Sequence, residues 1–94
     1  MAAYVIYQAD VLDPERYEEY RAKAAPSIAA AGGRYLIRGG DVEVLEGTLP
    51  AGRTVVVEFP DRETLLAWYH GEYAGIRKLR EGAAKATLYV IDGV

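Results

Sequence analysis

The chain of 94 residues contains no cysteine, a single histidine and a single serine. Without cysteine it has neither a disulfide framework nor thiolate chemistry, so we expect a cytoplasmic protein. One histidine is too few for a zinc site, which needs three or four ligands. Ser27 follows a proline inside an expected helix and lies far along the chain from His70. These absences argue against disulfide-stabilised folds, zinc enzymes and serine hydrolases.

Long apolar runs and basic segments are also absent. No stretch approaches the ~18 apolar residues that span a bilayer, and the first ten residues lack the basic region of a signal peptide. The net charge is −3 and the pI about 5.1, with acidic and basic residues interspersed. The basic surface of a nucleic-acid or membrane-surface protein is therefore missing, and the glycine pairs match no nucleotide-binding fingerprint. We expect no nucleic acid, no membrane and no cofactor, and favour a small molecule and a second copy of the chain as partners.

Hydrophobic residues make up 51% of the chain and charged residues 27%, which is typical of one folded domain over residues 1–94. Helix starts are indicated at Asp13-Pro14 and at Pro60-Asp61, and helix ends at Gly32-Gly33 and Gly71. β-branched and alternating apolar residues predict four strands. The strands are expected over 3–11, 34–46 with an interruption at Gly39-Gly40, 53–59 and 86–91.

This order, β-α-β-β-α-β, predicts an α+β fold of the ferredoxin-like type. A four-stranded antiparallel sheet would carry both helices on one face. The other face would be bare and more apolar than a soluble monomer normally exposes, so we expect a homodimer with the two sheets face to face. Expected on that bare face are Ile6, Gln8, Leu36, Arg38, Val56 and Glu58.

The strand Arg34–Arg38, with a glycine pair at each end, provides the main candidate site. Alternation along a strand predicts that Arg34, Leu36 and Arg38 share one face, where Arg38 would meet Glu58 beside Gln8. A buried arginine needs a carboxylate or a bound anion. In one interpretation Arg38 and Gln8 bind a small anionic or aromatic metabolite, and Glu58 orients it or moves a proton. In the other, Arg38 and Glu58 form only an internal ion pair in a non-catalytic structural or ligand-sensing dimer.

Three further residues complete the candidate set. Arg34 is a second potential ligand-binding cation, nearer the strand end and solvent. His70 is the only side chain with an ordinary pKa near neutrality, and could act as a general acid or base or simply be a solvated charge at a helix end. Tyr69, next to Trp68, could line a pocket for a flat ligand or pack between helices. The predicted catalytic residues are thus His70 and Glu58, and the predicted ligand-binding residues Arg38, Gln8, Tyr69 and Arg34.

Over essentially its whole length the chain resembles the DUF1330 family of the dimeric α/β-barrel superfamily. The resemblance rests on three segments: Gly32-Gly33-Arg34-Tyr35-Leu36-Ile37-Arg38-Gly39-Gly40, Val42-Glu43-Val44-Leu45-Glu46-Gly47 and Val55-Val56-Val57-Glu58-Phe59-Pro60. It implies the ferredoxin-like fold and a dimer, but no established activity.

Relatives in that superfamily include cofactor-free quinone-forming monooxygenases, lactone isomerases and haem enzymes. The residue types of this chain allow isomerisation, or oxygenation of an easily enolised substrate, without a cofactor. One segment departs from the family pattern Tyr-(Asn/Asp)-Ser-Pro-Glu-Tyr. Here it reads Tyr69-His70-Gly71-Glu72-Tyr73, so His70 replaces the small polar residue.

Overall fold

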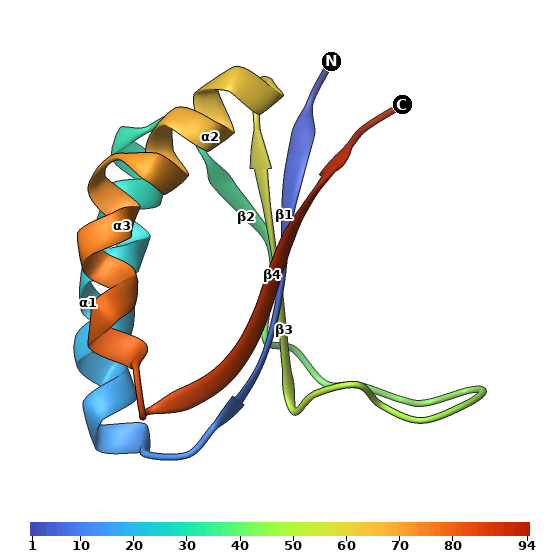
Figure 1. Cartoon of the computed structure of the whole chain (residues 1–94). Coiled ribbons are helices and arrows are strands. Elements are labelled where there is room, and N and C mark those ends of the chain that lie inside the picture. Colours follow the sequence, from blue (N-terminus) through green and yellow to red (C-terminus); the bar gives the residue numbers. More distant parts are fainter.

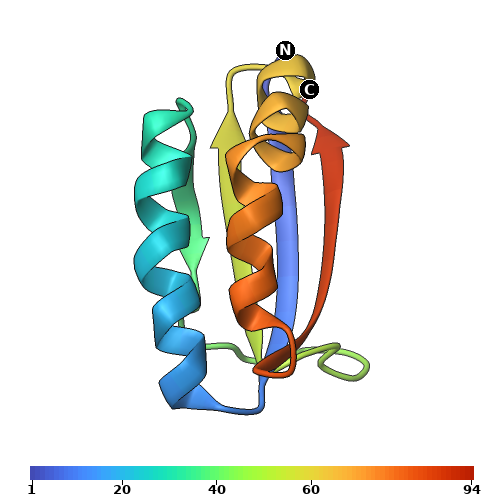
Figure 2. The ribbon, with the colours of Figure 1, turned by 60° about the vertical axis from the view of Figure 1, so that its left-hand side comes forward.

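Four antiparallel strands form one sheet in the computed structural model, which describes residues 1–94 (Figure 1). The helices all lie on one side of this sheet (Figure 2). Along the chain the elements are β1 (Ala3–Val11), α1 (Pro14–Ala30), β2 (Arg34–Arg38), β3 (Arg53–Phe59), α2 (Arg62–His70), α3 (Glu72–Ile76), the 3₁₀-helix η1 (Arg77–Arg80) and β4 (Ala84–Asp92).

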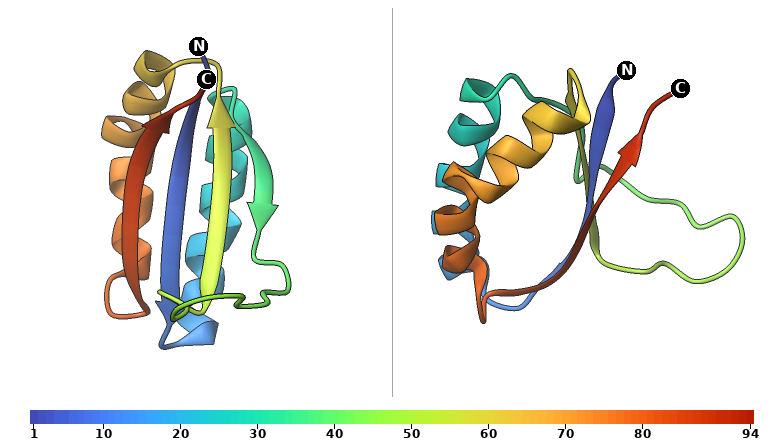
Figure 3. Two further views of the ribbon diagram at one scale, coloured as in Figure 1. Left: turned by 90° about the vertical axis from the view of Figure 1, so that its right-hand side faces the viewer. Right: turned by 45° about the horizontal axis from the view of Figure 1, so that its top comes forward.

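The strand order in the sheet is β2-β3-β1-β4. The strands β1 and β3 occupy the centre, and each of the two β-α-β units crosses over the same face (Figure 3). This is the ferredoxin-like arrangement that the order of elements predicts, so that prediction is confirmed. No helix is long and apolar enough to cross a membrane.

Capping residues set the helix boundaries. The side chain of Asp13 accepts a hydrogen bond of 3.2 Å from the backbone N–H of Arg16 at the start of α1. Asp61 accepts one of 2.7 Å from the backbone N–H of Thr64 at the start of α2. Each bond satisfies an amide that the first helical turn leaves free. The helix α1 continues past Pro26 to Ala30, and Gly71 separates α2 from α3.

The core lies between the helices and the sheet face that they cover. Alternate residues of the central strands point into it, including Val5 and Tyr7 of β1 and Val57 and Phe59 of β3. The helices contribute mostly aromatic and large apolar side chains, namely Tyr17, Tyr20, Ile28, Leu65, Trp68 and Tyr73. This layer is the hydrophobic centre of the chain, and it also contains the cavity described below.

The second predicted strand is shorter than expected. We predicted a strand from Arg34 to Glu46, but β2 ends at Arg38. Gly39 has φ +65°, a conformation that turns the chain out of the sheet and that residues with a Cβ rarely adopt. Residues 39–52 then form an extended loop, here called the arm, which projects on the side away from the helices (Figures 1 and 3).

A bulge in β2 overturns the predicted orientation of Arg38. Arg34 lies opposite Glu58 and Tyr35 opposite Val57, but the register then shifts so that Arg38 lies opposite Val55. Leu36 is the extra residue, and one extra residue reverses the alternation of all side chains beyond it. Arg38 therefore lies on the helix-covered face, and the prediction that it shares a face with Arg34 is wrong.

The uncovered face carries an apolar row that crosses all four strands. Ile6 of β1 lies between Val56 of β3 and Tyr89 of β4, and Val56 lies opposite Ile37 of β2. About half of the Ile37 surface is exposed, at 49%, and Tyr89 is 42% exposed. The prediction that Ile6, Gln8, Val56 and Glu58 lie on this face is confirmed by their register.

Candidate functional site

A cavity of about 40 Å³ lies between the helix-covered face of the sheet and the helices. Fifteen residues line it: twelve are hydrophobic and the other three are arginines. The lining comes from all four strands and from α1, α2 and α3, and is rich in aromatic rings: Tyr7, Tyr17, Tyr20, Tyr35, Trp68 and Tyr73. An apolar cavity with a few convergent polar groups is the usual form of a small-molecule site.

Two pairs of tyrosine hydroxyls provide the neutral polar atoms of the cavity. The hydroxyl oxygens of Tyr7 and Tyr17 are 2.9 Å apart, and those of Tyr20 and Tyr73 are 2.5 Å apart. Burial, followed by the hydrogen bond to Tyr17, raises the pKa of Tyr7 well above its ordinary value. Burial, followed by the neighbouring Tyr73, does the same to the pKa of Tyr20. The Tyr7 and Tyr20 phenols therefore remain protonated at neutral pH.

Three arginines form one side of the cavity. Arg38, at the end of β2, stacks its guanidinium over the ring of Tyr35, with Cζ 4.4 Å from the ring centroid. Arg53 begins β3 beside it, and Arg21 reaches the cavity from α1. Arg38 is exposed, whereas Arg21 and Arg53 are half-buried, so the cavity opens to solvent on this side. We call Arg21, Arg38 and Arg53 the arginine rim.

The arginine rim carries more positive charge than the protein neutralises. Of its members only Arg21 forms an ion pair, at 3.1 Å with the exposed Glu18. Arg38 and Arg53 have no carboxylate within ion-pair distance. In addition, the buried Nε atoms of Arg21 and Arg53 have no hydrogen-bond partner. Buried donors without partners are rare in folded proteins and indicate a place for an acceptor.

The guanidinium of Arg53 passes close to the backbone at Gly39. A Cβ on Gly39 would overlap Nη1 of Arg53 and lie 2.9 Å from its Cζ. The backbone N–H of Gly39 also donates a hydrogen bond of 2.9 Å to the carbonyl of Thr54. The close approach of the arginine to the backbone explains why a glycine follows β2 at this point.

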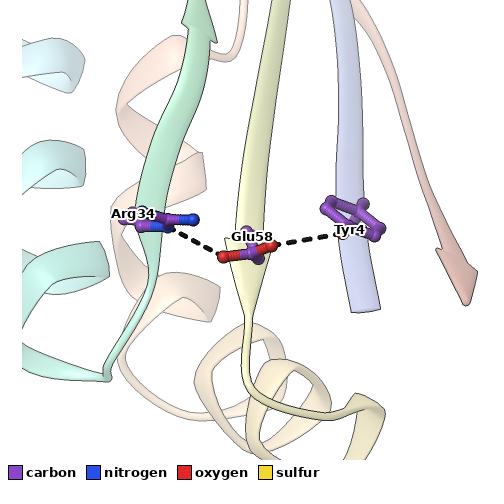
Figure 4. A network of polar contacts seen from close by, with 3 residues as sticks. All are labelled: Tyr4, Arg34 and Glu58. Carbon is purple, nitrogen blue, oxygen red and sulfur yellow. Dashed lines mark hydrogen bonds and ion pairs between the residues drawn. The ribbon is translucent and has the colours of Figure 1, made fainter. Parts of the chain in front are cut away.

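Glu58 belongs to a different cluster, on the uncovered face (Figure 4). Arg34 Nε donates a hydrogen bond of 2.8 Å to Glu58 Oε1, and the Tyr4 hydroxyl donates one of 3.1 Å to Oε2. The hydrogen bond from Arg34 holds the pKa of Glu58 below its ordinary value, and the bond to Glu58 raises the pKa of Tyr4. The predicted pair of Arg38 and Glu58 is wrong, because the bulge in β2 places Arg34 opposite Glu58 instead.

The remaining predicted site residues do not line the cavity. Gln8 lies on the uncovered face between Thr54 and Thr87. Tyr69, on α2, accepts a hydrogen bond of 2.7 Å from Arg77, and its ring meets the His70 ring edge-on. His70 is exposed at the end of α2. The structure thus brings Arg38 to the cavity, joins Arg34 to Glu58, and leaves His70 and Tyr69 on the helix layer.

Sequence reasoning missed Arg21, Arg53 and the four paired tyrosines as site residues. Tyr17 and Tyr20 belong to an apolar helical stripe, and such a stripe indicates core packing in most helices. Each pair joins two different elements: Tyr7 and Tyr17 are 10 residues apart, on β1 and α1, and Tyr20 and Tyr73 are 53 residues apart, on α1 and α3. No local pattern predicts such a pairing.

No group of three or more acidic or histidine side chains is placed to hold a metal ion.

Comparison with solved structures identifies the same fold in several proteins. RPA0582, a protein of unknown function from Rhodopseudomonas palustris, has a TM-score of 0.74 and 17% identity, over 99% of this chain and 82% of its own. A hypothetical Arabidopsis thaliana protein, At3g17210, has a TM-score of 0.67 and 13% identity, over 98% and 88% of the two chains.

A third similar structure is SnoaB, a cofactor-independent oxygenase from Streptomyces nogalater. Its TM-score is 0.65 and its identity 10%, over 99% of this chain and 93% of its own. At these identities the likeness concerns the fold alone. No curated protein matches the chain. The model of a domain of unknown function, DUF1330, matches residues 2–94, and the chain therefore belongs to the DUF1330 family.

Proposed function

We propose that this protein binds a small organic anion with an apolar or aromatic body in the cavity beside the arginine rim. The observation that carries the proposal is the pair Arg38 and Arg53, two cations without a carboxylate partner at the opening of an aromatic cavity. A guanidinium in this setting binds a carboxylate, enolate or phenolate through charge-assisted hydrogen bonds. The ring of Tyr35, over which the Arg38 guanidinium stacks at the rim, provides apolar contact for the rest of the ligand.

The size of the cavity limits how the ligand lies. A volume of about 40 Å³ holds a few water molecules and is smaller than the ~150 Å³ that admits benzene. The polar end of a ligand can therefore enter while its remainder lies in the opening between α1 and the ends of β2 and β3. The exposure of Arg38 agrees with such an opening.

Benzoate tests this proposal against benzyl alcohol, an uncharged analogue of similar shape. We expect benzoate to bind more tightly in isothermal titration calorimetry, and Arg38→Gln to weaken its binding about tenfold, the loss of one charge-assisted contact. Arg62→Gln is the matched control, because Arg62 is exposed and pairs with Asp92. Equal binding of both compounds, or an equal effect of both variants, would contradict the proposal.

We also propose that the chain forms a homodimer through the uncovered face of the sheet. The apolar row of Ile37, Val56, Ile6 and Tyr89 supports this, because an exposed row across a whole sheet marks an interaction surface. A two-fold axis would place the row of one copy against the same row of the other.

Native mass spectrometry checks both proposals together. A dimer with a reproducible adduct that denaturation removes would support them, and a monomer would contradict the dimer.

A second candidate function is cofactor-free proton-transfer or oxygenase chemistry at the subunit seam. Arg34, Glu58, Tyr4 and Gln8 lie on the face that such a dimer would cover, and SnoaB, of similar fold, is a cofactor-independent oxygenase. Glu58 would move the proton and Arg34 would hold the anion, whereas His70, at the end of α2 on the helix layer, lies outside this face. Oxygen uptake with acetylacetone, an easily enolised diketone, checks this candidate. Uptake should fall in Glu58→Gln, and uptake no faster than in buffer would count against catalysis.

A further inference from the structure

The polar side chains that line the cavity are tyrosines and arginines, so the cavity offers a ligand mainly hydrogen-bond donors. No carboxylate, imidazole or amide side chain is among the fifteen lining residues. The only side-chain acceptors are the phenolic oxygens, and all charges in the lining are positive. A ligand that donates hydrogen bonds finds few acceptors here, whereas a ligand that accepts them finds a surplus of donors.

The tyrosine pairs contribute two of these donors. A hydroxyl has one hydrogen, so in each pair one oxygen accepts and its own hydrogen remains free. No hydrogen bond from Tyr7, Tyr17, Tyr20 or Tyr73 to any other protein group satisfies that hydrogen. Each pair therefore holds one buried O–H that is available to a ligand oxygen.

The arginines provide the other hydrogen-bond donors around the cavity. The Nε–H groups of Arg21 and Arg53 are buried without partners, and so is that of Arg80. Arg80 lies next to the same tyrosines, with its Cζ 5.5 Å from the centroid of the Tyr7 ring and 5.8 Å from that of Tyr20. Its positive charge adds to that of the arginine rim from the side of η1. The walls of the cavity therefore carry both free hydroxyls and several guanidinium groups.

We propose that the cavity binds acidic phenols and enols in their ionised form, and so lowers the pH at which these ligands lose their proton. This inference rests on the proposed function and names its ligand class. An ionised phenol or enol presents only acceptors, as this lining requires, whereas the neutral form brings one more hydrogen to a site with a surplus of them. No base from the protein is needed, because the positive charges favour loss of the ligand's own proton to solvent.

Two opposing effects act on such a ligand. The apolar lining disfavours a charge through desolvation, whereas nearby cations and hydrogen-bond donors favour it. Around the cavity the cations outnumber the anions, since the only carboxylate paired to the rim is Glu18, whose side chain is 67% exposed. Burial raises the pKa of the lining phenols Tyr7, Tyr20 and Tyr35 despite the arginines near them. A ligand oxygen differs from these phenols because it would lie against the arginine rim and accept hydrogen bonds from the unpartnered Nε–H groups of Arg21 and Arg53. There the attraction should exceed the cost of desolvation. The ionisable groups that line the cavity are Arg21, Arg38, Arg53, Tyr7, Tyr17, Tyr20, Tyr35 and Tyr73, with Arg80 next to the Tyr7 and Tyr20 rings and Glu18 paired with Arg21.

The probe for this inference is 4-nitrophenol, whose ionised form absorbs visible light. Its absorbance is titrated with pH, free and in the presence of saturating protein. We expect the midpoint of the bound probe to lie lower by roughly 1 pH unit, as a cation within ~4–6 Å produces. Arg53→Gln should reduce the shift, and so should the double variant Tyr20→Phe with Tyr73→Phe, which removes one free hydroxyl without removing a charge. Arg62→Gln is the control that should leave it unchanged.

The outcomes separate this inference from the proposed function. If 4-nitrophenol binds with an unchanged or raised midpoint while benzoate still binds through Arg38, the preference for ionised phenols is wrong and the anion site remains. If the neutral analogue 4-nitroanisole binds as tightly as ionised 4-nitrophenol, the inference is also overturned. If neither 4-nitrophenol nor benzoate binds, both proposals fail. Thermal unfolding of each variant verifies that a lost shift does not reflect a lost fold.

Discussion

Paired tyrosine hydroxyls are the most consequential contacts at the scale of single residues. The pair of Tyr20 and Tyr73 joins α1 to α3 across a buried layer, and the pair of Tyr7 and Tyr17 joins β1 to α1. Hydroxyls in an apolar layer cost free energy unless they are hydrogen-bonded. Each pair meets this requirement within the protein and leaves one hydrogen for the cavity. The same atoms therefore serve both the fold and the candidate site.

We predict that Tyr20→Phe lowers the free energy of unfolding by about 1 kcal/mol, because it removes the hydrogen bond between the Tyr20 and Tyr73 hydroxyls. The double variant Tyr20→Phe with Tyr73→Phe should lose less than the sum of the two single changes, since it leaves no hydroxyl unpaired. Urea unfolding of the four proteins measures this difference. Additive losses would show that the pair does not act as a unit.

Alkaline pH should destabilise the protein through these tyrosines. Burial raises the pKa of Tyr7 and of Tyr20 above the value of about 10 that tyrosine has in an unfolded chain. A raised pKa in the folded state means that the stabilisation is complete below about pH 10 and decreases as the pH rises above it. We expect the urea midpoint to be constant up to that pH and then to fall. A urea midpoint that increases as the pH is raised beyond about 10 would contradict this assignment.

At the scale of secondary structure, the local signals in the sequence predict the order of the elements, but neither the length nor the orientation of the second strand. Asp13, Asp61 and Gly71 mark helix boundaries because capping and helix breaking depend on neighbouring residues alone. The bulge at Leu36 depends on the pairing of β2 with β3, which no local pattern records. The bulge places Arg38 on the other face and Arg34, instead of Arg38, opposite Glu58. The fold could therefore be predicted from the sequence, whereas the face of Arg38 and the partner of Glu58 could not.

Gly39 links the arm to the candidate site, and we predict that Gly39→Ala affects both stability and binding. An alanine at φ +65° costs roughly 1–2 kcal/mol, and its Cβ would displace the Arg53 guanidinium. We expect a lower melting temperature and weaker binding of benzoate. Gly40→Ala is the matched control, because its Cβ would meet no atom within 4 Å. Similar effects of the two variants would show that the position of Arg53 does not depend on Gly39.

At the scale of the whole molecule, the two faces of the sheet have different roles. The helix-covered face holds the core and the cavity, with its phenols and guanidinium groups. The uncovered face carries the apolar row and, next to it, the network of Arg34, Glu58 and Tyr4 (Figure 4). Because β1 and β3 contribute to both faces, a partner that covers the apolar row would contact the same strands that line the cavity.

The apolar row provides the prediction for the assembly. Ile6 lies at its centre, between Val56 and Tyr89, so Ile6→Glu would place a carboxylate in the middle of a sheet-to-sheet contact. An unpaired charge buried there is strongly unfavourable, and we expect the dimer to dissociate at micromolar concentration while the far-UV circular dichroism remains that of the folded chain. Ala22→Glu, on the exposed side of α1, is the control and should remain dimeric. Light scattering after size-exclusion chromatography measures the mass. If Ile6→Glu remains dimeric, the copies associate through another surface, and the apolar row then faces solvent in the assembled protein.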